Sequence, residues 1–287
     1  MYFPSIELLS PAKVNLRLEV LKKRADGYHE IRTLVQRISL SDKLRISLKE
    51  DEGISVTTDS PRLPIGEENL AYRAASSLLE EAQTRAGIGL HIQKEIPISS
   101  GLGGGSSNAA TILMGLNRIL KLNFSKDQLM EIGTRIGADV PFFIFERTAI
   151  ATGIGEKLQP AKIRPSIWLV LVNPSWEVST RWAYEGLNFE LTKRAIHITL
   201  PAFFRDIGHV ASILHNDLET VTIAAYPEID GIKRELVSHG AAGSLMAGSG
   251  PTVFGLFPHK KGAQGAYRQL KAQYAERGWG VYLAKTI

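Results

Sequence analysis

Apolar and polar residues alternate along the first 60 residues of the chain with the two-residue period of β-strands. Between residues 13 and 21, Val14, Leu16 and Leu18 alternate with Asn15 and Arg17, so one face of this strand is predicted to be apolar. A break at residues 10–12 separates it from a shorter strand. We expect the N-terminal sheet to contain strands over residues 5–9, 13–21, 31–38, 43–49 and 54–58.

Helices are predicted where apolar residues recur every three or four positions. Leu70, Ala74 and Leu78 follow Asn69 at this spacing, which predicts a helix over about 70–83 with Asn69 as its N-cap. A capping box at Ser125 predicts the start of another helix. The other expected elements are helices over about 108–120, 216–238 with an interruption at Pro227, and 260–277, and strands over 90–95, 149–158, 167–172, 244–247, 252–257 and 279–284.

The order of strands and helices predicts an α+β protein with two domains. The chain has 287 residues, of which 44% are hydrophobic, and is long enough to bury two cores. We expect the domains to cover residues 1–160 and 161–287. Residues 177–206 show no period and contain several aromatic side chains, so we expect an irregular segment that contributes to the core and to a cleft.

Composition narrows the classes of partner. The net charge is +5 and the basic residues are spread along the chain, which favours a solvated surface or anionic small molecules over nucleic acid. Cysteine is absent, which excludes disulfides and thiolate chemistry. The first residues lack the pattern of a secretory leader, and no apolar run reaches the length of a membrane span. We therefore expect a cytoplasmic protein that has neither nucleic acid nor a membrane as a partner.

A glycine-rich stretch at residues 97–110 carries the strongest chemical signal. Its four glycines, Gly101, Gly103, Gly104 and Gly105, can adopt positive φ and let the backbone approach a ligand closely. Small, helix-forming residues follow, so the stretch is predicted to lead into a helix N-terminus. Free N–H groups and the helix dipole favour an anion there, most often phosphate.

Two better-known phosphate loops do not fit this stretch. A Walker A loop ends in Gly-Lys-Ser/Thr, whereas Gly105 is followed by Ser106 and Ser107. The dinucleotide pattern G-x-G-x-x-G requires glycine at position 106 or 108, which hold serine and asparagine. The stretch therefore predicts another kind of nucleotide-binding loop, and a merely flexible glycine turn is the alternative.

Two other places in the chain are candidates for chemistry. Lys13 and Asn15 lie two residues apart in a predicted strand, so their side chains share one face; two ordinary polar residues on a solvent-facing surface are the alternative. Asp139 lies between a helix end and an apolar run, where burial tends to raise the pKa of a carboxyl group and make it a usable base. A cap for the segment that follows Pro141 is the alternative.

Three motifs together resemble the signatures of the GHMP kinases, a family of small-molecule kinases. They are PAKVN at residues 11–15, PISSGLGGGSSNAA at 97–110 and MAGSGPT at 246–252. The resemblance implies an N-terminal domain like ribosomal protein S5 domain 2, a ferredoxin-like C-terminal domain and ATP as co-substrate. It also implies that ATP is bound by Pro97, Ile98, Ser99, Ser100, Gly101, Leu102, Gly103, Gly104, Gly105, Ser106 and Ser107.

Two further motifs, DGYHEI at residues 26–31 and GADVPF at 137–142, resemble one branch of this family. That branch phosphorylates the 2-hydroxyl of a cytidine-diphosphate-linked methylerythritol in the non-mevalonate isoprenoid pathway. Phosphoryl transfer requires the protein to align a hydroxyl, accept its proton and offset negative charge. The resemblance implies that Asp139 is the base, that Lys13 lies beside it and lowers the pKa of the hydroxyl, and that Asn15 orients the polyol.

The same resemblance implies how the rest of the substrate is bound. Tyr28 is expected to stack on one face of the cytosine, and His29 to contact its polar edge. Tyr184 is expected to supply the second stacking ring, with Trp182 as the alternative. Thr180 is expected to contact the polyol.

The implied reaction also sets the expected cofactors and partners. Mg²⁺ is expected to bridge the ATP phosphates, although no group of residues in the sequence identifies its ligands. We expect a monomer or homodimer whose partners are ATP and the CDP-linked methylerythritol. Two alternatives stay open, namely a GHMP kinase of the mevalonate or homoserine type and a non-catalytic nucleotide- or RNA-binding protein on the same fold.

Overall fold

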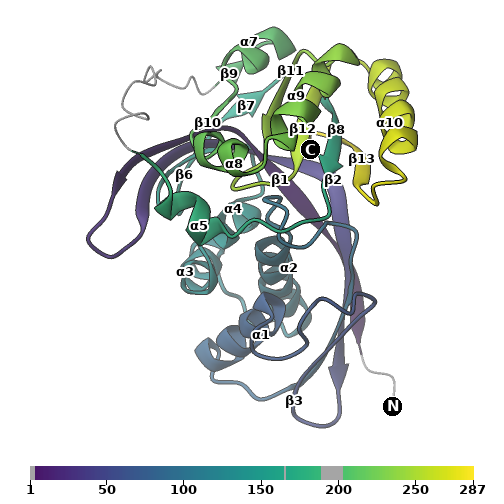
Figure 1. Cartoon of the computed structure of the whole chain (residues 1–287). Coiled ribbons are helices and arrows are strands. Elements are labelled where there is room, and N and C mark those ends of the chain that lie inside the picture. Colours follow the sequence, from purple (N-terminus) through teal and green to yellow (C-terminus); the bar gives the residue numbers. More distant parts are fainter. Residues whose placement is uncertain (1–3, 165, 189–202) are drawn as a thin grey trace. The chain divides into compact units, whose positions relative to one another are not determined.

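The computed structural model describes residues 4–164, 166–188 and 203–287 (Figure 1). These residues form two compact units, each made of segments that are separated in the sequence. Unit 1 contains the described residues up to 12, 41–98 and 103–146, and unit 2 contains 13–40, 99–102 and the described residues from 147 onward. The division of the chain at residue 160 stays a prediction.

Unit 1 combines a sheet with four helices. Its strands are parts of β1 (Ser5–Lys23) and β2 (His29–Lys49), with β3 (Gly53–Thr58) and β4 (Gly87–Gln93); β4 pairs antiparallel with β2 and parallel with β3. The helices are α1 (Leu70–Glu81), α2 (Gly104–Ile119), α3 (Lys126–Ile136) and α4 (Val140–Phe145). A Cβ atom on Gly115 of α2 would lie 2.3 Å from Ile46 Cδ1 and 2.8 Å from Leu8 Cδ1. Glycine at this position therefore lets α2 lie directly on the sheet.

Unit 2 contains three groups of strands. The first half of β2 pairs with β5 (Ala149–Gly153), which pairs with β6 (Lys157–Pro160), and β1 pairs with β10 (His215–Asn216). A four-stranded antiparallel sheet has the order β11 (Gly243–Met246), β12 (Val253–Phe257), β8 (Trp168–Asn173) and β13 (Gly280–Lys285). Two short parallel strands, β7 (Lys162–Ile163) and β9 (Phe203–Phe204), form the third group.

The helices described in unit 2 are α5 (Thr180–Glu185), α7 (Ile207–Ser212), α8 (Glu219–Ala225), α9 (Glu228–Ser238) and α10 (Lys260–Tyr274). The last two pack on the antiparallel sheet. Their inward residues Leu236 and Leu270 are fully buried, as is Phe257 of the sheet. The alternation of strands and helices agrees with the predicted α+β class.

Most predicted elements are confirmed, and several begin at the predicted caps. Asn69 Oδ1 accepts a hydrogen bond from Ala71 N at 2.9 Å at the start of α1. Ser125 and Gln128 form the predicted capping box at the start of α3. The interruption predicted at Pro227 separates α8 from α9. These local signals were sufficient because a cap satisfies helix N–H groups with a side chain a few residues away.

Three predicted boundaries differ from those in the structure. β1 continues through residues 10–12, where we expected a break, because Pro11 lacks only an N–H group and its carbonyl accepts from Ser107 Oγ at 2.6 Å. Similarly, β2 is one strand where two were expected. Helix α2 starts at Gly104, about four residues early, because Gly103 takes a left-handed conformation with φ 70° and acts as the N-cap.

The segment 177–206 is not irregular throughout. Ser179 Oγ accepts from Trp182 N at 3.3 Å and starts α5, and Phe203–Phe204 form β9. The prediction missed α5 because six residues are too few for a helical period to stand out. Residues 189–202, including Phe189, lie outside the described residues.

A buried acid in unit 1 holds the segment that leads into the glycine-rich stretch. Asp42 accepts from Glu95 N and Ile96 N, both at 2.9 Å, and pairs with the ammonium group of Lys94. The Asp42 side chain is fully buried, and that of Lys94 is 8% exposed. The position of residues 94–96 therefore depends on one carboxylate.

Replacement of Asp42 by alanine is expected to lower the free energy of unfolding by about 3–5 kcal/mol, because the buried Lys94 ammonium loses its counter-ion. Urea unfolding followed by circular dichroism measures this loss. Asp59→Ala is the matched control, since exposed Asp59 accepts a single bond from Lys94 N at 2.9 Å; its loss is expected to cost about 0.5–1.5 kcal/mol. Equal losses in the two variants would contradict the anchoring role of Asp42.

Candidate functional site

The first motif forms a hydrogen-bonded chain on the polar face of β1, within unit 2. Lys13 Nζ donates to Asn15 Oδ1 at 2.7 Å, and Asn15 Nδ2 donates to Thr33 Oγ1 at 2.9 Å. Thr33 Oγ1 in turn donates to the Arg17 carbonyl at 2.6 Å. The side chains of Lys13, Asn15 and Thr33 are buried, so the shared face is confirmed and the alternative of a solvent-facing surface is wrong.

The direction of this chain fixes the orientation of the Asn15 amide. The single proton of the Thr33 hydroxyl goes to the Arg17 carbonyl, so its oxygen accepts from the Asn15 NH₂ group. The Asn15 carbonyl oxygen consequently points to the Lys13 ammonium and accepts a hydrogen bond from it, with an N–O distance of 2.7 Å. Thr33 therefore determines which end of Asn15 faces Lys13.

Backbone from the second and third motifs approaches Lys13 in unit 2. Lys13 N donates to Leu102 O of the glycine-rich stretch at 3.0 Å. A Cβ atom on Gly248 would lie 3.5 Å from Lys13 Nζ and 3.1 Å from Gly101 O. Gly101 has φ +77°, and a Cβ atom there would lie 1.9 Å from Ala247 O. Glycine is required at 101 by both the conformation and the space, and the three motifs meet at this point.

Polar side chains hold the third motif in place. Asn216 Nδ2 donates to Met246 O at 2.9 Å and to Gly248 O at 2.7 Å. The hydroxyl groups of Ser249 and Thr180 lie 3.0 Å apart. The predicted polyol-binding residue Thr180, at the start of α5, therefore lies against the third motif.

The predicted base-binding residues lie at the start of β2 and on α5. The His29 and Tyr184 rings pack with centroids 5.1 Å apart and an interplanar angle of 32°. Burial lowers the pKa of His29, and the nearby Lys23 ammonium lowers it further against the opposing effect of Glu185, so the imidazole is neutral near pH 7. Tyr28 is 58% exposed, which leaves its ring accessible.

The two candidates for the second aromatic have different surroundings. Tyr184 and Trp182 are two residues apart on α5, and residues at that spacing do not share a helix face. Tyr184 packs against His29, whereas Trp182 lies edge-on to Tyr226 with ring centroids 6.2 Å apart. This arrangement favours Tyr184, and its role in substrate binding stays a prediction.

Unit 1 contributes the start of α2 to the predicted ATP loop. The N–H groups of Gly104, Gly105 and Ser106 have no acceptor within the helix, and the positive end of the helix dipole lies there. The Ser107 hydroxyl accepts from Ser10 Oγ at 2.8 Å and donates to Pro11 O at 2.6 Å. Ser107 thus ties α2 to β1 with its side chain, while its neighbours present main-chain donors.

Asp139 lies in unit 1, directly before α4. Asp139 occupies the N-cap position of α4, but its carboxylate makes no hydrogen bond to the N–H groups of that helix, so the alternative of capping by the side chain is wrong. The residue is half-buried. A Cβ atom on Gly137 would lie 3.9 Å from Ser106 Oγ, which places the turn before Asp139 close to the start of α2.

Three residues that support the site were missed by the sequence analysis: Thr33, Asp42 and Asn216. Each is buried, and each hydrogen-bonds to residues far away in the sequence. The available signal was a polar residue between apolar ones on the same strand face, since Ile31 and Val35 flank Thr33, and Leu40 and Leu44 flank Asp42, at the two-residue period. The partners of all three depend on tertiary packing, which no local pattern encodes.

Among the described residues, no group of three or more histidine, aspartate or glutamate side chains could hold a metal ion. In the same residues, no helix is both long enough and apolar enough to cross a membrane.

Sequence comparison places the chain among known kinases. The profile of the GHMP kinases N terminal domain matches residues 69–147, and that of the GHMP kinases C terminal matches 199–276. A 4-diphosphocytidyl-2-C-methyl-D-erythritol kinase from Geobacter metallireducens is 50% identical over 266 residues, which cover 93% of this chain and 94% of that protein. A protein of the same name from Geobacter sulfurreducens is 49% identical over 282 residues, covering 98% and 99%.

Comparison with solved structures agrees with the sequence matches. The crystal structure of a 4-(cytidine 5'-diphospho)-2C-methyl-D-erythritol kinase has a TM-score of 0.78 and 33% identity, covering 98% of this chain and 99% of that chain. The homoserine kinase of Cytophaga hutchinsonii shares the fold, with a TM-score of 0.74, 19% identity and coverage of 100% and 97%. The predicted two-domain GHMP kinase fold is confirmed. This chain belongs to the 4-diphosphocytidyl-2-C-methyl-D-erythritol kinases of the GHMP kinase family.

Proposed function

We propose that this chain transfers the γ-phosphate of ATP to the 2-hydroxyl of 4-diphosphocytidyl-2-C-methyl-D-erythritol, on the non-mevalonate route to isoprenoid precursors. The observation that carries the proposal is the meeting of the three motifs beside Lys13, in a chain 50% identical to a relative of that name. A kinase of another alcohol would share the motifs, but it would have no use for Tyr28 and His29.

ATP is assigned to the loop of residues 97–107. Gly101 and Gly103 have φ values of +77° and +70°, and successive N–H groups around such left-handed residues can form a concave anion site. The N–H groups at the start of α2 add donors for phosphate oxygens. This loop contains no lysine, so its affinity for phosphate depends on main-chain groups.

The reaction is assigned to Asp139 and Lys13. The Asp139 carboxylate accepts the proton of the attacked hydroxyl, and the Lys13 ammonium offsets charge on the transferring phosphoryl group. Lys13 suits this role because its ammonium is held by buried Asn15, so little reorganisation is needed during the reaction. Asp139 suits its role because it is half-buried and directly precedes α4, in a turn close to the start of α2.

The substrate is assigned to residues of unit 2. Tyr28 stacks on the cytosine, with Tyr184 as the second ring, and neutral His29 contacts the polar edge of the base. The packing of Tyr184 against His29 supports this grouping. Asn15 orients the polyol, and Thr180, next to Ser249, contacts it.

The remaining assignments follow from the reaction. Mg²⁺ bound together with ATP would offset negative charge on the transferring phosphoryl group, and no group of three or more acidic or histidine side chains among the described residues would hold it by itself. We assign the enzyme to the cytoplasm, as a monomer or homodimer, with ATP and the CDP-linked methylerythritol as its small-molecule partners.

The Asp139→Asn variant tests the base. Removal of a general base is expected to lower kcat by about 10²- to 10⁴-fold, with KM for ATP nearly unchanged. Steady-state ADP release measures both constants. Asp127→Asn, which alters an acid in the first turn of α3, is the control and is expected to keep wild-type turnover. A kcat for Asp139→Asn close to that of the control would remove the assignment.

Substitutions of Tyr28 test recognition of the base. Loss of a stacking ring worth about 1–3 kcal/mol is expected to raise KM for the cytidylyl substrate by roughly 5- to 150-fold in Tyr28→Ala. KM for ATP is expected to stay unchanged, and Tyr28→Phe, which keeps the ring, is expected to behave like the wild type. An unaltered KM in Tyr28→Ala would favour a substrate without a base.

Thr33 is expected to act as a positioning residue. Thr33→Val keeps the shape of the side chain and removes its hydrogen bonds to Asn15 and Arg17, so Lys13 loses its fixed support. We expect kcat to fall by about 10- to 100-fold, with recovery in Thr33→Ser, which restores the hydroxyl. Melting temperatures identify any general loss of stability. If serine does not restore turnover, the hydroxyl has no positioning role.

A further inference from the structure

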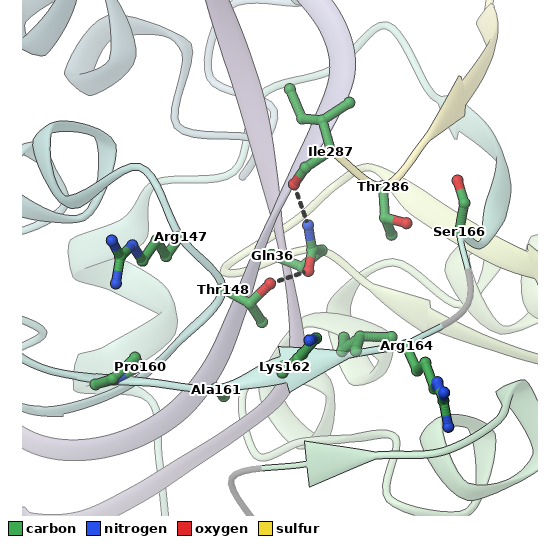
Figure 2. A pocket seen from close by; sticks show the side chains of 11 residues that line it. Gln36, Arg147, Thr148, Pro160, Ala161, Lys162, Arg164, Ser166, Thr286 and Ile287 are labelled. Atoms are coloured by element: carbon green, nitrogen blue, oxygen red, sulfur yellow. Dashed lines mark hydrogen bonds between the residues drawn. The ribbon is translucent and has the colours of Figure 1, made fainter.

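A pocket in unit 2, separate from the residues assigned above, has the composition of an anion site. Its volume is about 590 Å³, within the range of roughly 300–1,000 Å³ that is usual for small-molecule pockets. It is lined by β2, β7, the segment that follows α4 and the last residues of the sequence (Figure 2). None of its lining residues belongs to the assigned ATP or cytidylyl sites.

Positive charge dominates the lining. Arg147, Lys162 and Arg164 line the pocket, and no aspartate or glutamate side chain does. In Figure 2, Arg147 and Arg164 lie on either side of the pocket, with Lys162 between them. Over the described ranges, none of these three side chains takes part in an ion pair or hydrogen bond. Basic side chains that line one pocket and have no ion-pair partner among the described residues attract an anion.

The floor of the pocket is fixed by hydrogen bonds. Gln36 is buried, and its Oε1 accepts from Thr148 Oγ1 at 2.5 Å. Its Nε2 donates to Ile287 O at 2.8 Å (Figure 2) and also to Arg37 O at 2.7 Å. Both N–H bonds of the amide and one acceptor site of its oxygen are used within the protein, which leaves ligand contacts mainly to the groups around it.

The groups that remain for a ligand are mainly donors. Thr286 Oγ1 accepts from Ile167 N at 3.0 Å, which leaves its proton for another acceptor. Ser166 is exposed and also lines the pocket. With the three basic side chains, these hydroxyl groups form a set of donors that suits anionic oxygens and does not suit a cation.

The lining also narrows the class of anion. It contains no aromatic side chain, so there is no surface on which a nucleobase could stack. Three cationic side chains carry more positive charge than a monoanion would balance. The oxygens of a di- or triphosphate can each bind a different one of these side chains. We propose that this pocket binds a small di- or triphosphate anion through Arg147, Lys162 and Arg164.

Calorimetric titration with inorganic diphosphate tests the proposal. The full-length protein is first saturated with a non-hydrolysable ATP analogue, so that the ATP loop is occupied and the probe reports a second site. We expect binding at sub-millimolar concentration that weakens as salt screens the charges. Arg147→Ala, Lys162→Ala and Arg164→Ala are each expected to weaken it by about five- to tenfold, and the triple variant is expected to abolish it.

Lys261→Ala is the matched control, because Lys261 is exposed and does not line the pocket. It removes the same charge and is expected to leave diphosphate binding unchanged. Absence of binding at millimolar probe, or equal weakening by Lys261→Ala and the pocket variants, would overturn the proposal. Turnover of the pocket variants without diphosphate is expected to equal that of the wild type, so loss of this site is distinguishable from failure of the kinase assignment.

Discussion

The contact between two stretches of main chain, at Gly101 and at Ala247, is the constraint on which the site in unit 2 depends. A Cβ atom at Gly101 would lie 1.9 Å from Ala247 O, a distance that no side chain can tolerate. The contact brings the glycine-rich stretch against the third motif. Lys13 lies beside both, since its main-chain N donates to Leu102 O and its ammonium lies next to Gly248. Three short motifs act as one site because their backbones touch.

Buried hydrogen bonds then determine how the polar groups of this site point. The chain from Lys13 through Asn15 to Thr33 ends on a main-chain carbonyl, so each donor and acceptor along it has a defined partner. A satisfied buried network of this kind is rigid, whereas an incomplete one costs stability. Nearby, Glu19 is fully buried between Arg17 and Arg32, so the polar face of β1 is internal and needs these pairs.

In unit 1, buried polar side chains likewise fix the backbone by hydrogen bonds and an ion pair. Asp42 fixes the segment before the glycine-rich stretch with three contacts, and Ser107 fixes the helix after it through Pro11. The side chains of Asp42 and Ser107, on the two sides of the stretch, are therefore used in holding the fold. The first N–H groups of α2 have no acceptor within the helix, which agrees with the proposed anion site.

The sequence by itself determined most of the elements and the type of protein. Caps at Asn69 and Ser125, the shared face of Lys13 and Asn15 and the glycine-rich motif were all readable, because each depends on residues a few positions apart. Tertiary structure decided the rest: β1 runs through Pro11 because Ser107 meets its carbonyl, and Thr33 orients Asn15 across two strands. The pocket around Gln36 likewise unites segments from both ends of the sequence. Partners of this kind are selected by packing of the whole chain, and local periodicity does not contain that information.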